Sequence, residues 1–268
     1  MEIELEEFLF KEENSRTKES LVNYRLFYDL KLAAALRGYD LSLYTPDVDR
    51  DGFDIILDDQ DSVRKIQLKT VLKNATTSTW RIHKSMLRPD VEFCEYLGFE
   101  PTQSGVGVQG GVILMELNPL NDSMEIRYYY TDVFVITALY LDIVNRTPKI
   151  RSKIFDSFYQ NIRDGSSNEK MPVPKSLFVE AKSPEHLLGL MALHNRINHG
   201  WWHHLINIGK DHFFQPIDDS DLPAPKDKLR EVIADELIAL TNGLKNANTN
   251  KSSFLRTVKR CTKEEIKW

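Results

Sequence analysis

Residues 52–57 read GFDIIL and residues 63–72 read VRKIQLKTVL, and these two apolar stretches decide the fold. Their β-branched and aliphatic residues favour extended strands. The residues between them, 58–62, read DDQDS, a composition that favours turns. The sequence therefore predicts a β-hairpin with its turn near Gln60.

The predicted hairpin brings three polar side chains together. Its turn places Asp54 opposite Ile66 or Gln67, because turn length sets the register of the two strands. Gln67 and Lys69 are two residues apart, so both side chains leave the same face of their strand. Polar groups among buried aliphatic residues cost free energy unless they are paired or bind a ligand. We call Asp54, Gln67 and Lys69 the hairpin trio and take it as the candidate site.

A carboxylate, an amide oxygen and an ammonium together suit the hydrolysis of a phosphodiester. Oxygen ligands select Mg²⁺ or Mn²⁺ over zinc, and such a metal polarises a phosphate and lowers the pKa of its bound water. The ammonium would stabilise the nucleophile or the developing charge. The alternative is that these residues have only structural roles. Asp54 would then begin a strand as a turn-side carboxylate, and Lys69 would extend from a sheet edge.

The flanking sequence predicts an α/β fold. Residues 17–37 carry a helical pattern that stops at Gly38, and residues 39–44 alternate as a short strand. Further elements are expected as a helix at 86–97, strands at 111–117 and 126–130, and an apolar segment at 133–144. This order indicates a mixed sheet flanked by helices.

The composition and the sequence pattern of the chain change after about residue 146. Residues 162–175 form a polar loop rich in Gly, Ser and Pro, and helical patterns follow at 184–208 and 226–244. We therefore expect a catalytic core over residues 1–145 and a mainly helical C-terminal region over residues 146–268.

Asp54 and the motif Gln67-Leu68-Lys69 resemble the core of the PD-(D/E)XK nuclease superfamily, in the D…QxK version found in Mrr-like restriction nucleases. The order of helix, strand and hairpin also resembles the opening of that superfamily, and the resemblance spans roughly residues 15–135. It implies a restriction-endonuclease-like fold, with Asp54 and Gln67 as metal ligands and Lys69 as the catalytic lysine. The first helix of such folds often lends an acidic group, for which Glu19 is the candidate.

The sequence departs from the usual pattern of this superfamily at two positions. Phe53 rather than proline precedes the aspartate, and neutral Gln67 stands where an acid is usual, which lowers the charge of the site. A literal Pro-Asp pair ends at Asp47, in the loop before the strand, so Asp54 is preferred and Asp47 and Asp51 remain alternatives.

The segment that follows the hairpin has a composition suited to nucleic acid. Residues 76–84 read TTSTWRIHK and combine hydroxyls, cations and one indole, which can bind phosphates and stack on a base or sugar. The indole of Trp80 could equally pack in the core. The candidate nucleic-acid contacts are Lys73, Trp80, Arg81, His83 and Lys84.

Charge is strongly segregated along the 268 residues. The net charge of −5 is unusual for a protein that binds nucleic acid. Residues 40–61, however, hold eight Asp against one Arg, whereas residues 63–90 hold seven Lys or Arg against one Asp. Cys94 and Cys261 lie far apart without a CxxC motif, and neither a signal sequence nor a membrane span is evident, so we expect a cytoplasmic protein.

Three weaker motifs point elsewhere. Residues 105–110 match GxGxxG but precede a strand instead of a helix, so a loop is expected there. Histidines and tryptophans cluster within residues 194–204, where a packed helix junction is favoured over a zinc site because no HExxH motif is present. Residues 244–268 carry a net charge of +5, which fits either a DNA-binding tail or a solvated helix.

These features predict an Mg²⁺- or Mn²⁺-dependent endonuclease that cuts DNA, in a setting such as restriction or anti-phage defence. The biological setting follows only from the resemblance. One alternative is a non-catalytic nucleic-acid-binding or assembly subunit that keeps the fold, which neutral Gln67 favours. Another is an endoribonuclease. A homodimer or a larger defence complex is also consistent with paired cuts in a duplex.

Overall fold

The computed structural model describes residues 5–46, 52–89, 105–107, 109–120, 123–193 and 226–261. The elements of the first half are α1 (Leu5–Phe10), the 3₁₀ turn η1 (Glu12–Asn14), α2 (Ser15–Ala35), β1 (Ser42–Tyr44), β2 (Ile55–Asp58), β3 (Val63–Leu72), β4 (Thr79–His83), α3 (Lys84–Leu87), β5 (Gly110–Leu120) and β6 (Ser123–Thr131). Those that follow are α5 (Val133–Tyr140), β7 (Val144–Arg146), α6 (Ser152–Arg163), β8 (Lys170–Pro174), η2 (Lys175–Leu177), β9 (Val179–Glu180), α7 (Pro184–Leu190), α9 (Lys226–Thr241), β10 (Ala247–Thr249) and α10 (Lys251–Cys261).

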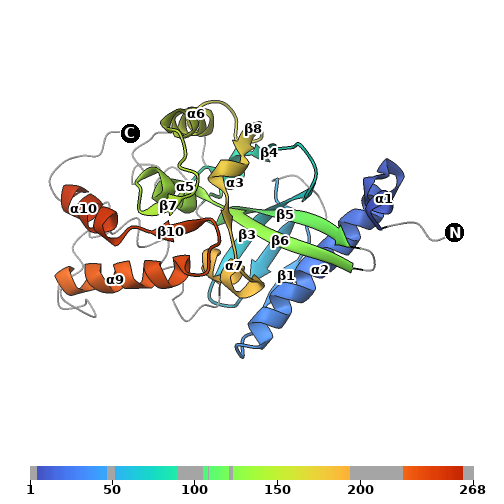
Figure 1. The fold of residues 1–268 in the computed structure, drawn as a ribbon, viewed down its shortest axis with the longest axis horizontal. Coiled ribbons are helices and arrows are strands. Elements are labelled where there is room, and N and C mark those ends of the chain that lie inside the picture. The colour runs from blue at the N-terminus through green and yellow to red at the C-terminus, as the bar shows by residue number, and fades with distance from the viewer. Residues whose placement is uncertain are drawn as a thin grey trace.

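A six-stranded mixed sheet organises the core, with strand order β1-β2-β3-β5-β6-β9 (Figure 1). The strands β1, β2 and β3 pair antiparallel along the chain, whereas β3 and β5 pair parallel over eight residue pairs, from Lys65 with Gly110 to Leu72 with Leu117. A parallel pair needs a crossover between its strands, and residues 73–109 supply it. The predicted hairpin is therefore confirmed as β2 and β3, at the centre of a larger sheet.

The long helix α2 packs on one face of this sheet. It buries Val22, Leu26, Leu30 and Ala34, which recur every four residues and so lie along one side of the helix. The hydroxyl of Tyr128 on β6 donates a 2.6 Å hydrogen bond to the carboxylate of Asp29, which ties the helix to the sheet. This helix confirms the one predicted over residues 17–37.

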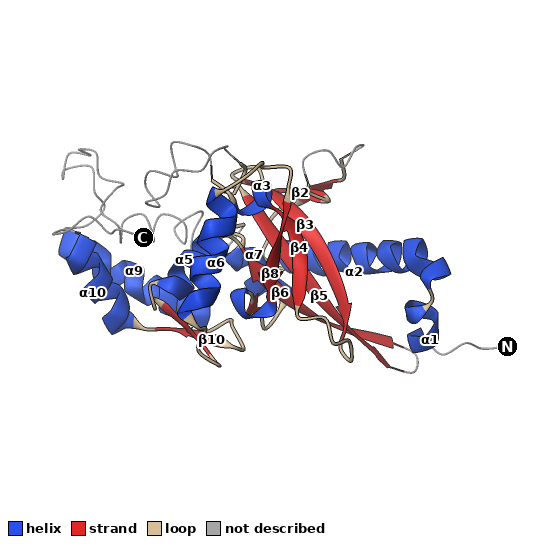
Figure 2. Cartoon of the chain, turned by 90° about the horizontal axis from the view of Figure 1, so that it is seen from above, coloured by secondary structure: helices blue, strands red, loops and turns tan. Residues whose placement is uncertain are grey.

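The second half of the chain is interleaved with the first. Strand β9 extends the central sheet beside β6, β8 pairs with β4, and β10 pairs with β7. The boundary predicted at residues 145 and 146 falls inside β7, which is paired over its whole length. Helices α9 and α10 lie at the end of the molecule opposite α1 in both views (Figures 1 and 2). Residues 146–268 thus contribute strands to the core as well as helices.

The other predicted elements have mixed outcomes. Strands are present at 111–117 and 126–130, within the longer β5 and β6, and α9 confirms a helix in 226–244. The apolar segment from residue 133 becomes α5, whose first turn is capped by the Asp132 carboxylate accepting from the Val135 N–H at 2.7 Å. The helix expected at 86–97 is described only as α3, and the one at 184–208 only as α7. Among the described residues, no helix is long and apolar enough to cross a membrane.

Candidate functional site

The turn of the hairpin fixes its register through its own side chains. The carboxylate of Asp59 accepts from the N–H groups of Asp61 and Ser62 at 3.1 and 2.6 Å, and Gln60 adopts a positive φ of 74°. Ile55 then pairs with Ile66 as the last residue pair of the hairpin, and the N–H of Asp54 also donates to the carbonyl of Ile66, so Asp54 lies beside Ile66 at the end of the ladder.

Asp54 lies where the ladder between the two strands ends. Its N–H donates to the carbonyl of Ile66 at 2.8 Å, and its Oδ2 accepts from the N–H of Leu68 at 2.5 Å. Leu68 lies beyond the last residue pair of β2, so the carboxylate takes the place of a strand partner. Asp54 therefore has the structural role that was considered as an alternative from the sequence. The same contact holds its carboxylate beside residues 67–69.

Gln67 connects the hairpin to the end of β4. The side chain is buried, and its Oε1 accepts from the N–H of His83 at 3.1 Å. The imidazole of His83 packs directly on Gly52, where an added Cβ would lie 2.4 Å from the His83 Cγ. Gly52 also has a φ of 80°, which favours glycine. His83 therefore joins the trio, although the sequence suggested only a nucleic-acid contact for it.

Lys69 provides the cation of the site. It is partly buried on β3, two residues beyond Gln67. Among the residues that the structure describes, its ammonium forms no hydrogen bond or ion pair. A cation on a partly buried sheet surface without an internal counter-ion is suited to an anionic ligand.

The sheet register shows which face carries Lys69. Tyr128 points toward α2, since its hydroxyl bonds to Asp29. Tyr128 pairs with Met115, and Met115 pairs with Thr70, so all three share the face that α2 covers. Lys69 is adjacent to Thr70 and therefore points to the opposite face.

Glu19 is consequently not brought together with the hairpin trio. It is exposed on α2, which covers one face of the sheet, whereas Gln67 and Lys69 project from the other. In the described part of the chain, no group of three or more His, Cys, Asp or Glu side chains could hold a metal ion. The expected third metal ligand is thus not supplied by α2. Asp47, Asp51 and the histidines within 194–204 lie outside the described residues.

A cation at the trio would be held by few protein ligands. Asp54 offers a carboxylate and Gln67 an amide oxygen, and each can bind a metal while it keeps its hydrogen bond, because each has further lone pairs. Mg²⁺ is commonly held by one or two carboxylates and keeps several water molecules. The residues present therefore fit a weakly held, largely hydrated Mg²⁺ or Mn²⁺.

Two of the residues expected to contact nucleic acid belong to the protein interior. Trp80 is buried with its ring edge-on to Phe178, at 5.9 Å between centroids. Lys84 is buried as well, and its Nζ bonds to the Glu169 carboxylate at 2.7 Å and to the Asp164 carbonyl at 2.8 Å. The Lys84 hydrogen bond lowers the pKa of Glu169 below its usual value. The core-packing interpretation of Trp80 is the correct one, and Lys84 is a structural cation.

The remaining cations of this segment lie on an exposed ribbon of β4 and β8. Arg81 is exposed, and its Nη2 donates to the carbonyl of Lys170 at 3.1 Å. Lys170 is exposed too and pairs in register with His83. Lys73 is exposed just after β3. Lys170 could not be identified from the sequence, because nothing local links it to a strand about ninety residues earlier.

A network of charged side chains around the buried carboxylate of Glu116 occupies the same sheet face as Lys69. Glu116 on β5 is buried, accepts from the Lys175 ammonium, and lies 3.8 Å from an Arg127 nitrogen. Lys175 also lies over the ring of Tyr129, 4.5 Å from its centroid. Burial, followed by the nearby carboxylates of Glu180 and Glu116, raises the pKa of Tyr129 far above its usual value. The buried Glu116 carboxylate is thus paired with cations from β6 and η2, and this pairing supports the fold.

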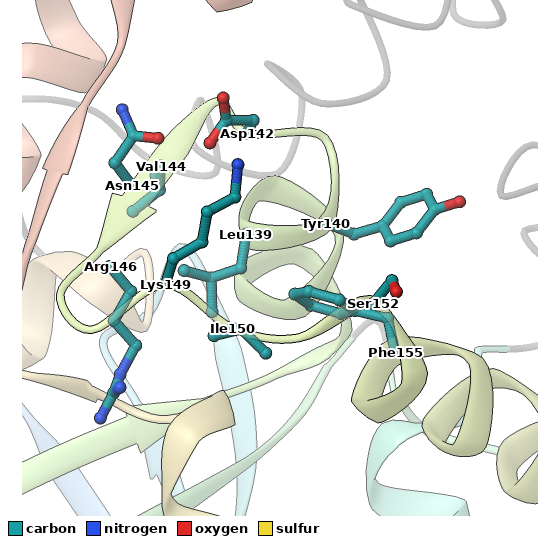
Figure 3. A pocket seen from close by; sticks show the side chains of 10 residues that line it. All are labelled: Leu139, Tyr140, Asp142, Val144, Asn145, Arg146, Lys149, Ile150, Ser152 and Phe155. Carbon is teal, nitrogen blue, oxygen red and sulfur yellow. The ribbon is translucent and has the colours of Figure 1, made fainter.

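A separate pocket of about 470 Å³ opens between α5, β7 and the start of α6 (Figure 3). Leu139, Val144, Ile150 and Phe155 form its apolar part. Lys149 extends its ammonium toward the side of the pocket where Asp142 lies (Figure 3). None of the lining residues belongs to the hairpin trio.

Comparisons of this chain with protein-family models, with curated proteins and with solved structures find no match. Function is therefore argued from the site itself.

Proposed function

We propose that this protein is an Mg²⁺- or Mn²⁺-dependent nuclease that hydrolyses DNA at the hairpin trio. The observation that carries the proposal is that the Asp54 carboxylate lies at the Leu68 N–H, between Gln67 and Lys69 along β3, with His83 bonded to Gln67. Within the described part of the chain, the Lys69 ammonium has no hydrogen bond or ion pair. The element order α2, β1, β2, β3 also agrees with the helix, strand and hairpin expected from the resemblance to PD-(D/E)XK nucleases. The choice of DNA, a role in restriction or defence and a cytoplasmic location rest on that resemblance and on the sequence.

Each residue of the trio has a distinct part in this chemistry. A bound Mg²⁺ supplies a polarised phosphate and a water of lowered pKa. Asp54 presents a carboxylate oxygen that the Leu68 N–H holds in place, and Gln67 presents an amide oxygen oriented by the His83 N–H. Lys69 places a positive charge where negative charge develops on the phosphate during attack.

Asp54→Asn tests the proposal with little disturbance of the fold. Asparagine keeps an oxygen that can accept from the Leu68 N–H but loses the charge that holds a divalent cation. Cleavage of plasmid DNA in Mg²⁺ or Mn²⁺ should fall by about 100-fold or more. Asp58→Asn is the matched control, since Asp58 ends the same strand and its carboxylate accepts only from the Gln60 N–H among its described contacts.

The same assay includes a matched single-stranded RNA beside the DNA. Cleavage of RNA alone would overturn the DNA assignment, while intact substrates under all conditions would overturn the nuclease proposal. Equal cleavage by wild type and Asp54→Asn would place the chemistry elsewhere.

The exposed ribbon predicts how DNA is held. Arg81→Ala and Lys170→Ala should each weaken DNA binding only a few-fold and lower the slope of log affinity against log salt concentration by about one, since each removes one phosphate contact. Lys153→Ala, which removes an exposed lysine on α6 and not on β4 or β8, should leave the slope unchanged. Fluorescence anisotropy across a salt series measures both quantities, and unchanged slopes for both ribbon variants would exclude this surface.

A second candidate is a nucleic-acid-binding subunit without catalysis. The observation in its favour is that Asp54 and Gln67 already accept hydrogen bonds that hold the hairpin to its surroundings. Such a module would show no Asp54-dependent metal site. Titration of Mn²⁺, followed by water-proton relaxation, separates the two functions: a site lost in Asp54→Asn supports the nuclease, and the same binding in both proteins supports the binding module.

A further inference from the structure

Helix α2 exposes a row of large apolar side chains. Leu21, Tyr24, Tyr28, Leu32 and Leu36 are 45%, 70%, 63%, 43% and 78% exposed, and we call them the outer stripe. Single exposed apolar residues are ordinary, but a contiguous apolar stripe on one helix marks an interaction surface.

The outer stripe lies opposite the buried side of the same helix. Successive residues of an α-helix are turned by about 100°, so the side chains of Tyr24, Tyr28 and Leu32 each point roughly 160° away from the buried side chain two positions earlier, which is Val22, Leu26 or Leu30. The buried side contacts the sheet, as the Asp29 bond to β6 shows, so the stripe on the opposite side of the helix faces away from the sheet. A helix that is apolar on both sides is expected when both sides are covered.

Four stripe residues, together with exposed Ala35, are arranged symmetrically about Tyr28, while Leu36 falls outside this symmetry. Tyr24 and Leu32 lie four residues to either side of it, and Leu21 and exposed Ala35 lie seven residues to either side. Two antiparallel copies of α2 related by a two-fold axis at Tyr28 would therefore place Tyr24 against Leu32 and Leu21 against Ala35 of the other copy. Such self-complementarity is the requirement for an isologous contact.

The size and composition of the outer stripe also suit a dimer. A tyrosine buries about 150–250 Å², so two that are mostly exposed offer roughly 200–300 Å² between them. With the leucines, the stripe falls in the range of about 300–600 Å² for the largest apolar patch of a protein. A standard interface buries about 800 Å² on each partner, so exposed polar neighbours of the stripe such as Arg25 would form the rim.

We propose that the outer stripe of α2 is the interface of a homodimer in which two antiparallel copies of α2 pack about a two-fold axis at Tyr28. This interface is independent of the nuclease proposal, because α2 covers the sheet face opposite the one that carries Gln67 and Lys69. Its test measures association alone, so it can fail or succeed whatever the catalytic result.

The first test is molar mass by light scattering across a concentration series. The wild type should reach twice 31.1 kDa. Tyr28→Glu should raise the dissociation constant at least about 30-fold, because it removes the central aromatic anchor and places two like charges at the axis. Tyr44→Glu is the matched control: Tyr44 is 53% exposed on β1, outside the stripe, and the variant should dimerise like the wild type.

The second test fixes the geometry and does not depend on a destabilising charge. In a background with Cys94→Ser and Cys261→Ser, Tyr28→Cys should be linked to its counterpart by a short bis-maleimide. Ala35→Cys should not, since two copies of residue 35 would lie about 21 Å apart along antiparallel helices. A monomeric wild type, a dimer that survives Tyr28→Glu, or linkage through residue 35 instead of 28 would each overturn the proposed interface.

Discussion

Lys69→Ala is expected to lower the rate of metal-dependent DNA cleavage by about 100- to 1000-fold, the usual loss when one preorganised charge at a reacting centre is removed. The free energy of unfolding should change by no more than about 0.5 kcal/mol, because the Lys69 ammonium has no hydrogen bond or ion pair in the described part of the chain. Lys69→Ala should thus lower the cleavage rate and leave the free energy of unfolding almost unchanged. Single-turnover cleavage and urea unfolding measure the two effects.

Lys65→Ala is the matched control for this experiment. Lys65 lies on the same strand and the same face as Lys69, on the other side of Gln67, and its Nζ lies 5.5 Å from the centroid of the Phe53 ring. Removing it changes the net charge by the same amount. If both variants lose activity equally, the effect is general electrostatics, and the assignment of Lys69 as the charge at the phosphate is wrong.

The hairpin could be predicted because its causes are local. The turn is built by the side chains of Asp58 and Asp59 bonding to backbone N–H groups within the next three residues, and such bonds follow from sequence neighbours alone. The alternation along β3 then places Gln67 and Lys69 on one face without further information. Both steps depend only on residues close in the chain.

The partners of the hairpin could not be predicted in the same way. The pairing of β3 with β5 and the addition of β9 to the sheet join segments separated by long stretches of chain. A boundary at residue 145 was inferred from a change in composition, yet the strand β7 that contains it pairs with β10, about a hundred residues later. Amino-acid composition describes one stretch of chain at a time and carries no information on the pairing of distant strands.

The errors among the nucleic-acid contacts have two different physical origins. Trp80 and Ile82 are buried while Thr79 and Arg81 are exposed, a period of two that the sequence already contained and that favours Trp80 as a core residue. Lys84 could not be assigned from its neighbours, because its partner Glu169 approaches only through the pairing of β4 with β8. His83 joined the trio for the same non-local reason.

Arg88→Ala is expected to destabilise the fold by about 3–5 kcal/mol, because it removes several hydrogen bonds from a charged donor, each of which contributes about 1.5–3 kcal/mol. Arg88 is fully buried. Its guanidinium donates to the carbonyls of Ile162, Asp164 and Gly165 at 2.6, 3.0 and 3.1 Å. These carbonyls lie at the end of α6, where a helix has no internal donors for its last four residues. The alanine would leave the buried carbonyl of Ile162 without this donor and would remove the part-buried bonds to the carbonyls of Asp164 and Gly165.

Arg163→Ala separates this effect from a general loss of charge near the end of α6. Arg163 is the last residue of the helix, its side chain is 52% exposed, and it meets Asp164 at 3.3 Å. An exposed ion pair of this kind contributes little to the free energy of unfolding, so its loss should change that free energy by less than about 0.5 kcal/mol. Arg88→Lys should fall between the two variants, because an ammonium keeps the charge but cannot reach several carbonyls with the planar fork of a guanidinium.

The ordering of these three variants in urea unfolding tests how the two halves of the chain are joined. Arg88 follows α3 in the first half, and the carbonyls that it binds belong to the second, so a large loss in Arg88→Ala requires the halves to unfold together. If α6 instead formed part of an independent helical domain, the variant would show two separate transitions, with the sheet retaining its wild-type midpoint. A single transition displaced to lower urea, with Arg88→Lys between Arg88→Ala and Arg163→Ala, is the expected result.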